Sequence, residues 1–191
     1  MASLLRIQGR RLNDTSAQAA IAEAGRRVAT IAVVHDLLAH NPGEMVDFDE
    51  VANKVVSLTL ETSVPLKVNL TTDMQFGLLS SDRATPLALV LAEVVANALE
   101  HGQTSAGMAS IHVSASRTAE RITVMISDNG SGIALPLDTS KGLGLEIVRT
   151  LVVEELGGHI DFEHENEIFS HGTRVTIVIA LSEIPIAHGV E

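Results

Sequence analysis

The 191-residue sequence contains no cysteine, no tryptophan and no tyrosine. The lack of cysteine excludes a disulfide, a thiolate nucleophile and a cysteine-based zinc site, and it fits a reducing compartment. Aromatic residues make up only 2% of the chain, so aliphatic side chains must fill the core. A platform of aromatic rings for stacking nucleic acid bases is therefore not expected.

Positive charge is also scarce, because 13 lysines and arginines face 24 aspartates and glutamates and the net charge is −11. An acidic surface repels phosphate backbones, so we expect no nucleic acid partner. A polyphosphate ligand would need a metal ion and a local run of backbone N–H groups. Apolar runs are short or interrupted by charge, as by Glu93, and no signal peptide opens the chain. We expect a cytoplasmic protein and no membrane contact in this chain.

Apolar residues recur at helical spacing from Ala17 to Leu38, and Asn41-Pro42-Gly43 ends the run. Residues 4–11 have the pattern of a helix end, and residues 13–15 that of a turn and cap. Residues 1–43 are therefore predicted to form a helical hairpin with a short first arm. Residues 44–183 are expected to form the main domain and residues 184–191 a tail.

The main domain is predicted to mix helices with strands. Helical spacing or flanking signals predict helices over 48–62, 85–101 and 143–156, and strands are expected over 67–71, 110–116, 121–128, 159–163 and 173–181. Consecutive strands joined by tight turns, with the helices collected elsewhere, favour an α+β two-layer sandwich over a doubly wound parallel sheet.

The helix expected over 85–101 carries a concentrated polar stripe, since steps of four place Glu93, Asn97 and His101 on one side with Glu100 beside them. An asparagine oxygen suits Mg²⁺, whose shell water and phosphate oxygens would complete. A carboxylate one turn earlier would orient or deprotonate a nucleophile. A solvated helix face explains the same stripe equally well.

Strand parity places Asp128 at the end of a row that faces the core. A carboxylate there needs a donor, and the exocyclic amine of adenine would be one. Gly130 and Gly132 follow, and they permit close approach of the backbone to a flat ligand, although a simple turn gives the same tetrad. Thr173 heads the last strand with the same parity, so it would share a ligand with Asp128.

Gly142-Leu143-Gly144-Leu145 opens the helix expected over 143–156, where unpaired N–H groups form an anion site. Lys141, just before it, would meet a phosphate as a point charge or lie in solvent. Residues 133–141 are the candidate lid. The glycine spacings of the P-loop and of the dinucleotide fingerprint are both absent, and the histidines show no metal-binding spacing.

These segments, in this order, resemble the N, G1, G2 and G3 boxes of the ATPase superfamily shared by gyrase, Hsp90, histidine kinases and MutL. The resemblance covers roughly residues 45–183 and implies the Bergerat α/β sandwich with bound ATP and Mg²⁺. It implies that Glu93 is the catalytic acid or base and that Asn97 holds Mg²⁺. The implied nucleotide contacts are Asn97, His101, Asp128, Gly130, Gly132, Lys141, Gly142, Leu143, Gly144, Leu145 and Thr173.

Within this superfamily, Leu4–Gln8 and Arg27–Leu38 resemble the dimerisation hairpin of bacterial sensor histidine kinases, and most of all the soluble kinases that signal to antitermination regulators. The resemblance implies transfer of the ATP γ-phosphate to a histidine, relay to an aspartate of a response regulator, and homodimerisation through the hairpin. In that group the phosphoacceptor lies just upstream of the segment matched by Leu4–Gln8, so we expect a truncated chain that binds Mg-ATP without phosphorylating itself. For His35 in the second helix we expect an interior or interface position.

Two other functions fit the same ATPase boxes. An anti-sigma-factor-type serine kinase needs no long dimerisation hairpin and would leave phosphoserine on a small acceptor protein. A non-catalytic switch would use ATP only to change shape or partner, and its nucleotide binding would not respond to Glu93→Ala.

Overall fold

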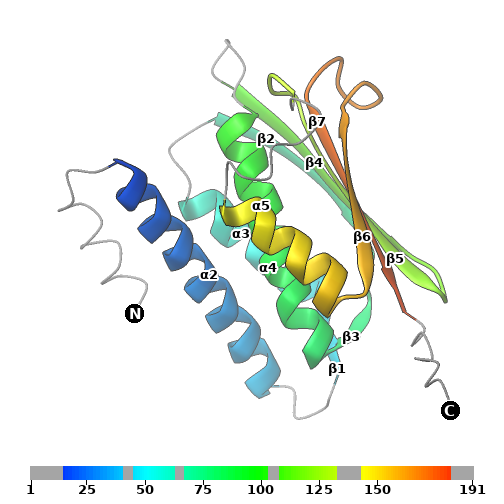
Figure 1. Ribbon diagram of the computed structural model, residues 1–191. Coiled ribbons are helices and arrows are strands. Elements are labelled where there is room, and N and C mark those ends of the chain that lie inside the picture. The colour runs from blue at the N-terminus through cyan, green and yellow to red at the C-terminus, as the bar shows by residue number, and fades with distance from the viewer. Residues whose placement is uncertain (1–14, 41–44, 63–66, 103–107, 133–142, 182–191) are drawn as a thin grey trace, which may run out of the picture.

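A computed structural model of the chain describes residues 15–40, 45–62, 67–102, 108–132 and 143–181. The described helices collect on one face of a five-stranded sheet, and no described element covers the opposite face (Figure 1). The helices are α2 (Thr15–His40), α3 (Phe48–Thr62), α4 (Ser81–His101) and α5 (Leu143–Thr150), which continues into a π-helical segment η2 (Leu151–Glu155). The strands are β1 (Met45–Asp47), β2 (Lys67–Met74), β3 (Leu78–Ser80), β4 (Met108–Arg117), β5 (Arg121–Asp128), β6 (Gly158–His164) and β7 (Thr173–Ala180).

The large sheet has the strand order β2-β4-β5-β7-β6. Strand β2 pairs with β4 in parallel because α4 crosses over between them, whereas β4–β5, β5–β7 and β7–β6 are antiparallel. This arrangement confirms the prediction of an α+β two-layer sandwich. It also places the C-terminal end of β5 beside the start of β7, in the middle of the strand order.

The core lies between the sheet and the helix layer. Alternate residues of β4, β5 and β7 point toward the helices, so each strand contributes a buried apolar row. Helix α4 is the central helix, and it is buried on most sides because α2, α3, α5 and the sheet all pack against it. The largest fully buried apolar side chains are Phe48, Phe76, Leu87, Leu91, Leu99, Ile111, Ile122, Ile126, Leu156, Ile177 and Ile179.

A second, two-stranded sheet formed by β1 and β3 was not expected from the sequence. Each strand has three residues, which is too short for an alternating pattern to be recognised. Its geometry is fixed instead by contacts between distant residues: the Asp49 carboxylate accepts the backbone N–H groups of Phe76 (2.7 Å) and Gly77 (3.0 Å), and the Phe48 and Phe76 rings meet edge to face. The sequence carries no local signal for such a pairing.

The helix expected over 143–156 is a regular α-helix only as far as Thr150, and its last turn is the π-helical η2. Helix α2 is a single helix of 26 residues that packs through Thr30 and Val34 against α3 and α4. The first arm of the expected hairpin, residues 1–14, and the tail from residue 184 lie outside the described residues. Among the helices that the structure describes, none is long and apolar enough to span a membrane.

Candidate functional site

Asp128 is the last residue of β5 and is 5% exposed to solvent. The Oδ1 atom accepts hydrogen bonds from the backbone N–H groups of Gly130 (2.8 Å) and Thr173 (3.3 Å), while no group among the described residues donates to Oδ2. Burial raises the pKa of the Asp128 carboxyl above its ordinary value, and the two backbone N–H groups offset only part of this effect. The carboxylate is therefore a buried acceptor with one oxygen left for a donor outside the described protein groups.

Three glycines bring backbone segments into direct contact around Asp128. A Cβ added to Gly172 would lie 1.8 Å from the Asp128 carbonyl oxygen, and one added to Gly130 would lie 2.3 Å from the carbonyl oxygen of His101. A Cβ on Gly102 would lie 3.3 Å from the Asp128 Cβ. The three glycines thus allow close packing of the end of α4, the end of β5 and the start of β7.

Gly132, the second glycine of the loop after β5, has a backbone φ of +81°, which residues other than glycine rarely adopt. A Cβ there would approach the Gly172 carbonyl oxygen and the His164 ring to 3.2 Å. Asn129 ties the same loop to β4, because its side chain accepts the Ser110 N–H at 2.7 Å. The loop after β5 is thus in contact with Ser110 of β4, His164 of β6 and Gly172, and these contacts fix the position of Asp128.

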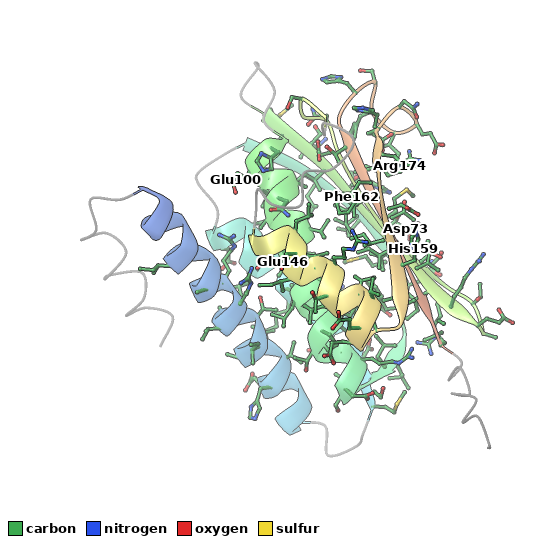
Figure 2. The ribbon with its side chains drawn as sticks, viewed as in Figure 1. Asp73, Glu100, Glu146, His159, Phe162 and Arg174 are labelled. Carbon is green, nitrogen blue, oxygen red and sulfur yellow. The ribbon has the colours of Figure 1, made fainter. Side chains whose placement is uncertain are left out.

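The C-terminal end of α4 lies against this site. His101 is exposed, and its charge lowers the pKa of Asp128, although less than burial raises it. Asn97, one turn earlier, is half-buried, and its side-chain amide makes no hydrogen bond within the described residues. Glu100 is exposed at the upper end of α4 (Figure 2). The structure thus places Asp128, Thr173 and His101 close together.

Glu93 has a different environment from the one expected. Glu93 is only 2% exposed to solvent, and its Oε1 accepts a hydrogen bond from Arg27 Nε at 3.0 Å. Because Arg27 belongs to α2, the carboxylate faces the contact between α2 and α4. The expected polar stripe is therefore divided: Glu93 is buried in an ion pair, Asn97 is half-buried and His101 is exposed.

The predicted phosphate-binding segment is only partly described. Lys141, Gly142 and the candidate lid over 133–141 lie outside the described residues, and of Leu143 only the backbone, which opens α5, is described. Gly144 and Leu145 follow in the first turn of α5 and are half-buried. Leu145 also lines a groove of about 390 Å³ between α5 and β6, together with Arg149, Val153, His159, Ile160, Asp161 and Phe162.

Several residues at the site were not identified as site residues from the sequence. Gly102 is buried against Asp128, Arg27 binds Glu93, and a buried ion pair joins Glu165 to Arg174 beside Thr173. A pairing of Glu165 with Arg174 is suggested by a nine-residue separation across a predicted hairpin. Nothing in the sequence indicates that Arg27 meets a residue 66 positions away.

The buried Asp128 acceptor, the close-packed glycines around it and the two-layer sandwich are typical of a nucleotide-binding domain of the α+β class. The chain belongs to the family of histidine kinase-, DNA gyrase B- and HSP90-like ATPases, which matches residues 82–183, and this membership implies ATP binding. A second family, described as histidine kinase, matches residues 1–63. The resemblance of the sequence boxes to this superfamily is confirmed.

The relatives include two sensor histidine kinases. The sensor histidine kinase PdtaS of Mycobacterium tuberculosis is 37% identical over 183 residues, covering 93% of this chain and 36% of that protein. PdtaS of Mycolicibacterium smegmatis is 34% identical over 187 residues, covering 95% of this chain and 36% of that protein. The chain thus spans about a third of the length of these relatives.

Among solved structures, the histidine kinase domain of a blue-light activated histidine kinase from Erythrobacter litoralis has a similar fold. The TM-score is 0.71 at 22% sequence identity, and the match covers 94% of this chain and 83% of that chain. The likeness extends over the sheet and the helix layer, so it supports the fold described above.

Proposed function

We propose that this chain is the Mg-ATP-binding catalytic part of a sensor histidine kinase that acts in the cytoplasm. In the proposed reaction, the bond between the γ-phosphorus and the β–γ bridging oxygen breaks and a phosphorus–nitrogen bond to a histidine forms. ADP leaves, and the proton of the imidazole passes to a base. The phosphoryl group then moves to an aspartate of a response regulator, for which we favour the antitermination type on the resemblance of the hairpin.

The observation that carries this proposal is the hydrogen bonding of Asp128. Both protein donors bind Oδ1, and Oδ2 accepts nothing from the described residues. Asp128 is a buried residue whose Oδ2 is left to accept a hydrogen bond, and the exocyclic amine of adenine would donate it. The half-buried Thr173, next to Asp128, would line the same pocket.

Asn97 fits a role as the protein ligand of Mg²⁺. Its amide oxygen is not used within the described residues, it lies one turn before the end of α4, and oxygen ligands suit this ion. No cluster of three or more histidine, cysteine or acidic residues in the described part would hold a metal alone. The ATP phosphates and water would therefore complete the shell, and the ion would neutralise phosphate charge.

Two other elements complete the proposed site. The first turn of α5, with Gly144 and Leu145, offers unpaired N–H groups and the positive end of a helix dipole to the phosphates, and Lys141 and Gly142 would adjoin it. Glu93 would act as the base for the acceptor histidine once it is released from Arg27. These roles are the ones that the family resemblance implies for this sequence.

Homodimerisation is proposed through α2. Its outer side exposes Val28 (37%) and Ile31 (45%) beside the exposed Ala24 and Ala32, which form a helical stripe of apolar residues next to the exposed His35. A second copy of the chain would cover this stripe as part of a helical bundle. A dimer of the wild type that becomes a monomer in Val28→Asp/Ile31→Asp, measured by light scattering, would support this; an unchanged mass would contradict it.

The nucleotide site is tested by binding of a non-hydrolysable ATP analogue with and without Mg²⁺. Wild type should bind in a Mg²⁺-dependent way, Asn97→Asp should bind more weakly with an altered metal response, and Asp128→Asn should lose adenine recognition. If the three proteins bind alike, the proposed site is wrong.

The reaction is tested by supplying a separate acceptor hairpin that contains a histidine. We expect acid-labile phosphate on this histidine with wild type and its loss in Glu93→Ala, while ATP binding persists in the variant. Phosphoserine on another acceptor would instead favour a serine kinase. Nucleotide binding without any transfer, and without a response to Glu93→Ala, would favour a switch module.

A further inference from the structure

A buried ion pair lies beside the start of β7, on the side of the sheet away from the helices. Glu165 is 1% exposed and Arg174 is 7% exposed. The Arg174 guanidinium donates from Nε to Glu165 Oε2 (3.1 Å) and from Nη2 to Oε1 (3.0 Å), a two-point contact. Figure 2 shows Arg174 in the upper part of the sheet, at the end where β7 begins.

The Glu165 carboxylate also determines the conformation of the loop between β6 and β7. Its Oε1 accepts the backbone N–H groups of Glu167 (2.6 Å) and Ile168 (2.8 Å), while the backbone N–H of Glu165 donates to the Gly172 carbonyl oxygen at 3.0 Å. Glu165 therefore binds the beginning of the loop, the Gly172 carbonyl oxygen at its far end, and Arg174 in β7. The Glu165 side chain thus fixes the loop, and its Oε2 contact with Arg174 Nε is the one that a glutamine, with a donor in place of this oxygen, would lose.

This loop ends on the proposed adenine site. Gly172 has φ +130° and lies in backbone contact with Asp128, and the next residue, Thr173, donates its N–H to Asp128 Oδ1 at 3.3 Å. Arg174 follows Thr173 directly, so its side chain points to the opposite face of β7. A shift of the loop would move the Thr173 N–H, and with it the orientation of the Asp128 carboxylate.

Stability alone is a weak reason for a buried ion pair, because desolvation of the two charges offsets much of their attraction. A rigid orientation is a better reason, since the two-point contact between a carboxylate and a guanidinium fixes both groups. The ion pair is placed where it fixes Gly172 and Thr173.

We propose that Glu165 and Arg174 are positioning residues for adenine recognition, which act through the loop over 165–172 and the Thr173 N–H on the Asp128 carboxylate. This inference rests on the proposed function, because it assumes that Asp128 binds adenine. It adds two residues on the far face of the sheet to the determinants of nucleotide specificity. Neither residue touches the nucleotide.

The test compares ATP with inosine triphosphate, which carries a carbonyl oxygen where adenine carries the amine that Asp128 would bind. In the full chain, Glu165→Gln should weaken ATP binding about tenfold, as expected for the loss of one well-oriented hydrogen bond. Inosine triphosphate binding should not change, so the preference for adenine falls. General destabilisation of the site would weaken both nucleotides alike.

Glu163→Gln is the matched control. Glu163 is exposed and is the register partner of Arg174 on β6, and its side chain makes no hydrogen bond within the described residues. The substitution removes the same charge two residues away and should leave both affinities unchanged. If Glu165→Gln does not fold, Arg174→Lys carries the same test, because it keeps the charge and removes the two-point contact.

The outcomes separate the two proposals. Wild type that prefers ATP over inosine triphosphate, with an unchanged preference in folded Glu165→Gln, contradicts only the positioning role. Equal weakening of both nucleotides contradicts it too. Wild type without any preference contradicts the proposed role of Asp128 itself. A selective loss of ATP binding in Glu165→Gln, absent in Glu163→Gln, supports the inference.

Discussion

Arg27 of α2 donates a hydrogen bond from Nε to Oε1 of Glu93 on α4, over 3.0 Å, and this ion pair joins α2 to the central helix of the ATPase fold. The Glu93 side chain is 3% exposed and that of Arg27 is 18% exposed. The carboxylate proposed as the catalytic base is thus bound by the very element that dimerises in the proposed function. Any movement of α2 away from α4 would have to break this ion pair.

The first prediction concerns the stability of this contact. Arg27→Gln leaves the buried Glu93 carboxylate without its guanidinium and should lower the free energy of unfolding by about 3 kcal/mol. Glu93→Gln should cost less, because Arg27 is closer to solvent and keeps more of its hydration. Urea unfolding of both variants and of the double variant measures the coupling. Additive effects would mean that the ion pair contributes no interaction energy.

The sequence predicts the large elements well, because their signals are local. The apolar rows of β5 and β7 give strand parity, and parity alone places Asp128 and Thr173 on one face, as found. The strands β1 and β3 and the Arg27–Glu93 pair were not predictable, because they depend on contacts between residues 30 or more positions apart. Propensity and periodicity contain no information on such pairs.

The second prediction concerns pH and Asp128. Since burial raises the pKa of this carboxyl, the folded protein holds the proton more tightly than the unfolded chain does. The stability that the bound proton contributes is fully present below pH 3.8, the ordinary pKa of an aspartate, and it is lost as pH rises through the raised pKa of Asp128. ATP binding should show the opposite trend, because the amine of adenine needs the ionised carboxylate as acceptor.

Asp128→Asn tests both effects. The Asn oxygen still accepts the N–H groups of Gly130 and Thr173, and no charge is buried, so the nucleotide-free variant should be at least as stable as wild type at neutral pH. ATP binding should fall at least tenfold, because the amide nitrogen meets the adenine amine as a second donor. Thermal melting and calorimetric titration measure the two quantities. A destabilised variant with intact ATP affinity would contradict the assigned role.

The third prediction concerns acid unfolding. Burial alone would raise the pKa of Glu165, but hydrogen bonds from Arg174 and from the N–H groups of Ile168 and Glu167 lower it to about 2. Because the pKa is lowered, the ionised carboxylate stabilises the fold at pH values above 4.5, the ordinary pKa of a glutamate, and this stability is lost as pH falls through about 2. The contribution to the free energy of unfolding is about 3 kcal/mol. Urea unfolding between pH 5 and pH 2 should therefore be less steeply pH-dependent in Glu165→Gln than in wild type. Equal slopes would show that this carboxylate is not bound as described.

The fourth prediction compares two glycines that both have positive φ. At Gly172 a Cβ would lie 1.8 Å from the Asp128 carbonyl oxygen, a backbone atom that moves only with the end of β5. At Gly157 (φ +60°) a Cβ would meet nothing within 4 Å. Gly157→Ala should therefore cost only the backbone strain, about 1 kcal/mol, whereas Gly172→Ala should cost about 3 kcal/mol or more.

The same pair separates stability from function. Gly157 lies at the turn from η2 into β6, far along the chain from the residues around Asp128, so folded Gly157→Ala should bind ATP like wild type. Gly172→Ala should lose ATP binding even at temperatures where circular dichroism shows it folded, because the clash displaces the Thr173 N–H and the carboxylate that accepts it. Retention of wild-type ATP affinity in folded Gly172→Ala would mean that the contact between β5 and β7 does not shape the nucleotide site.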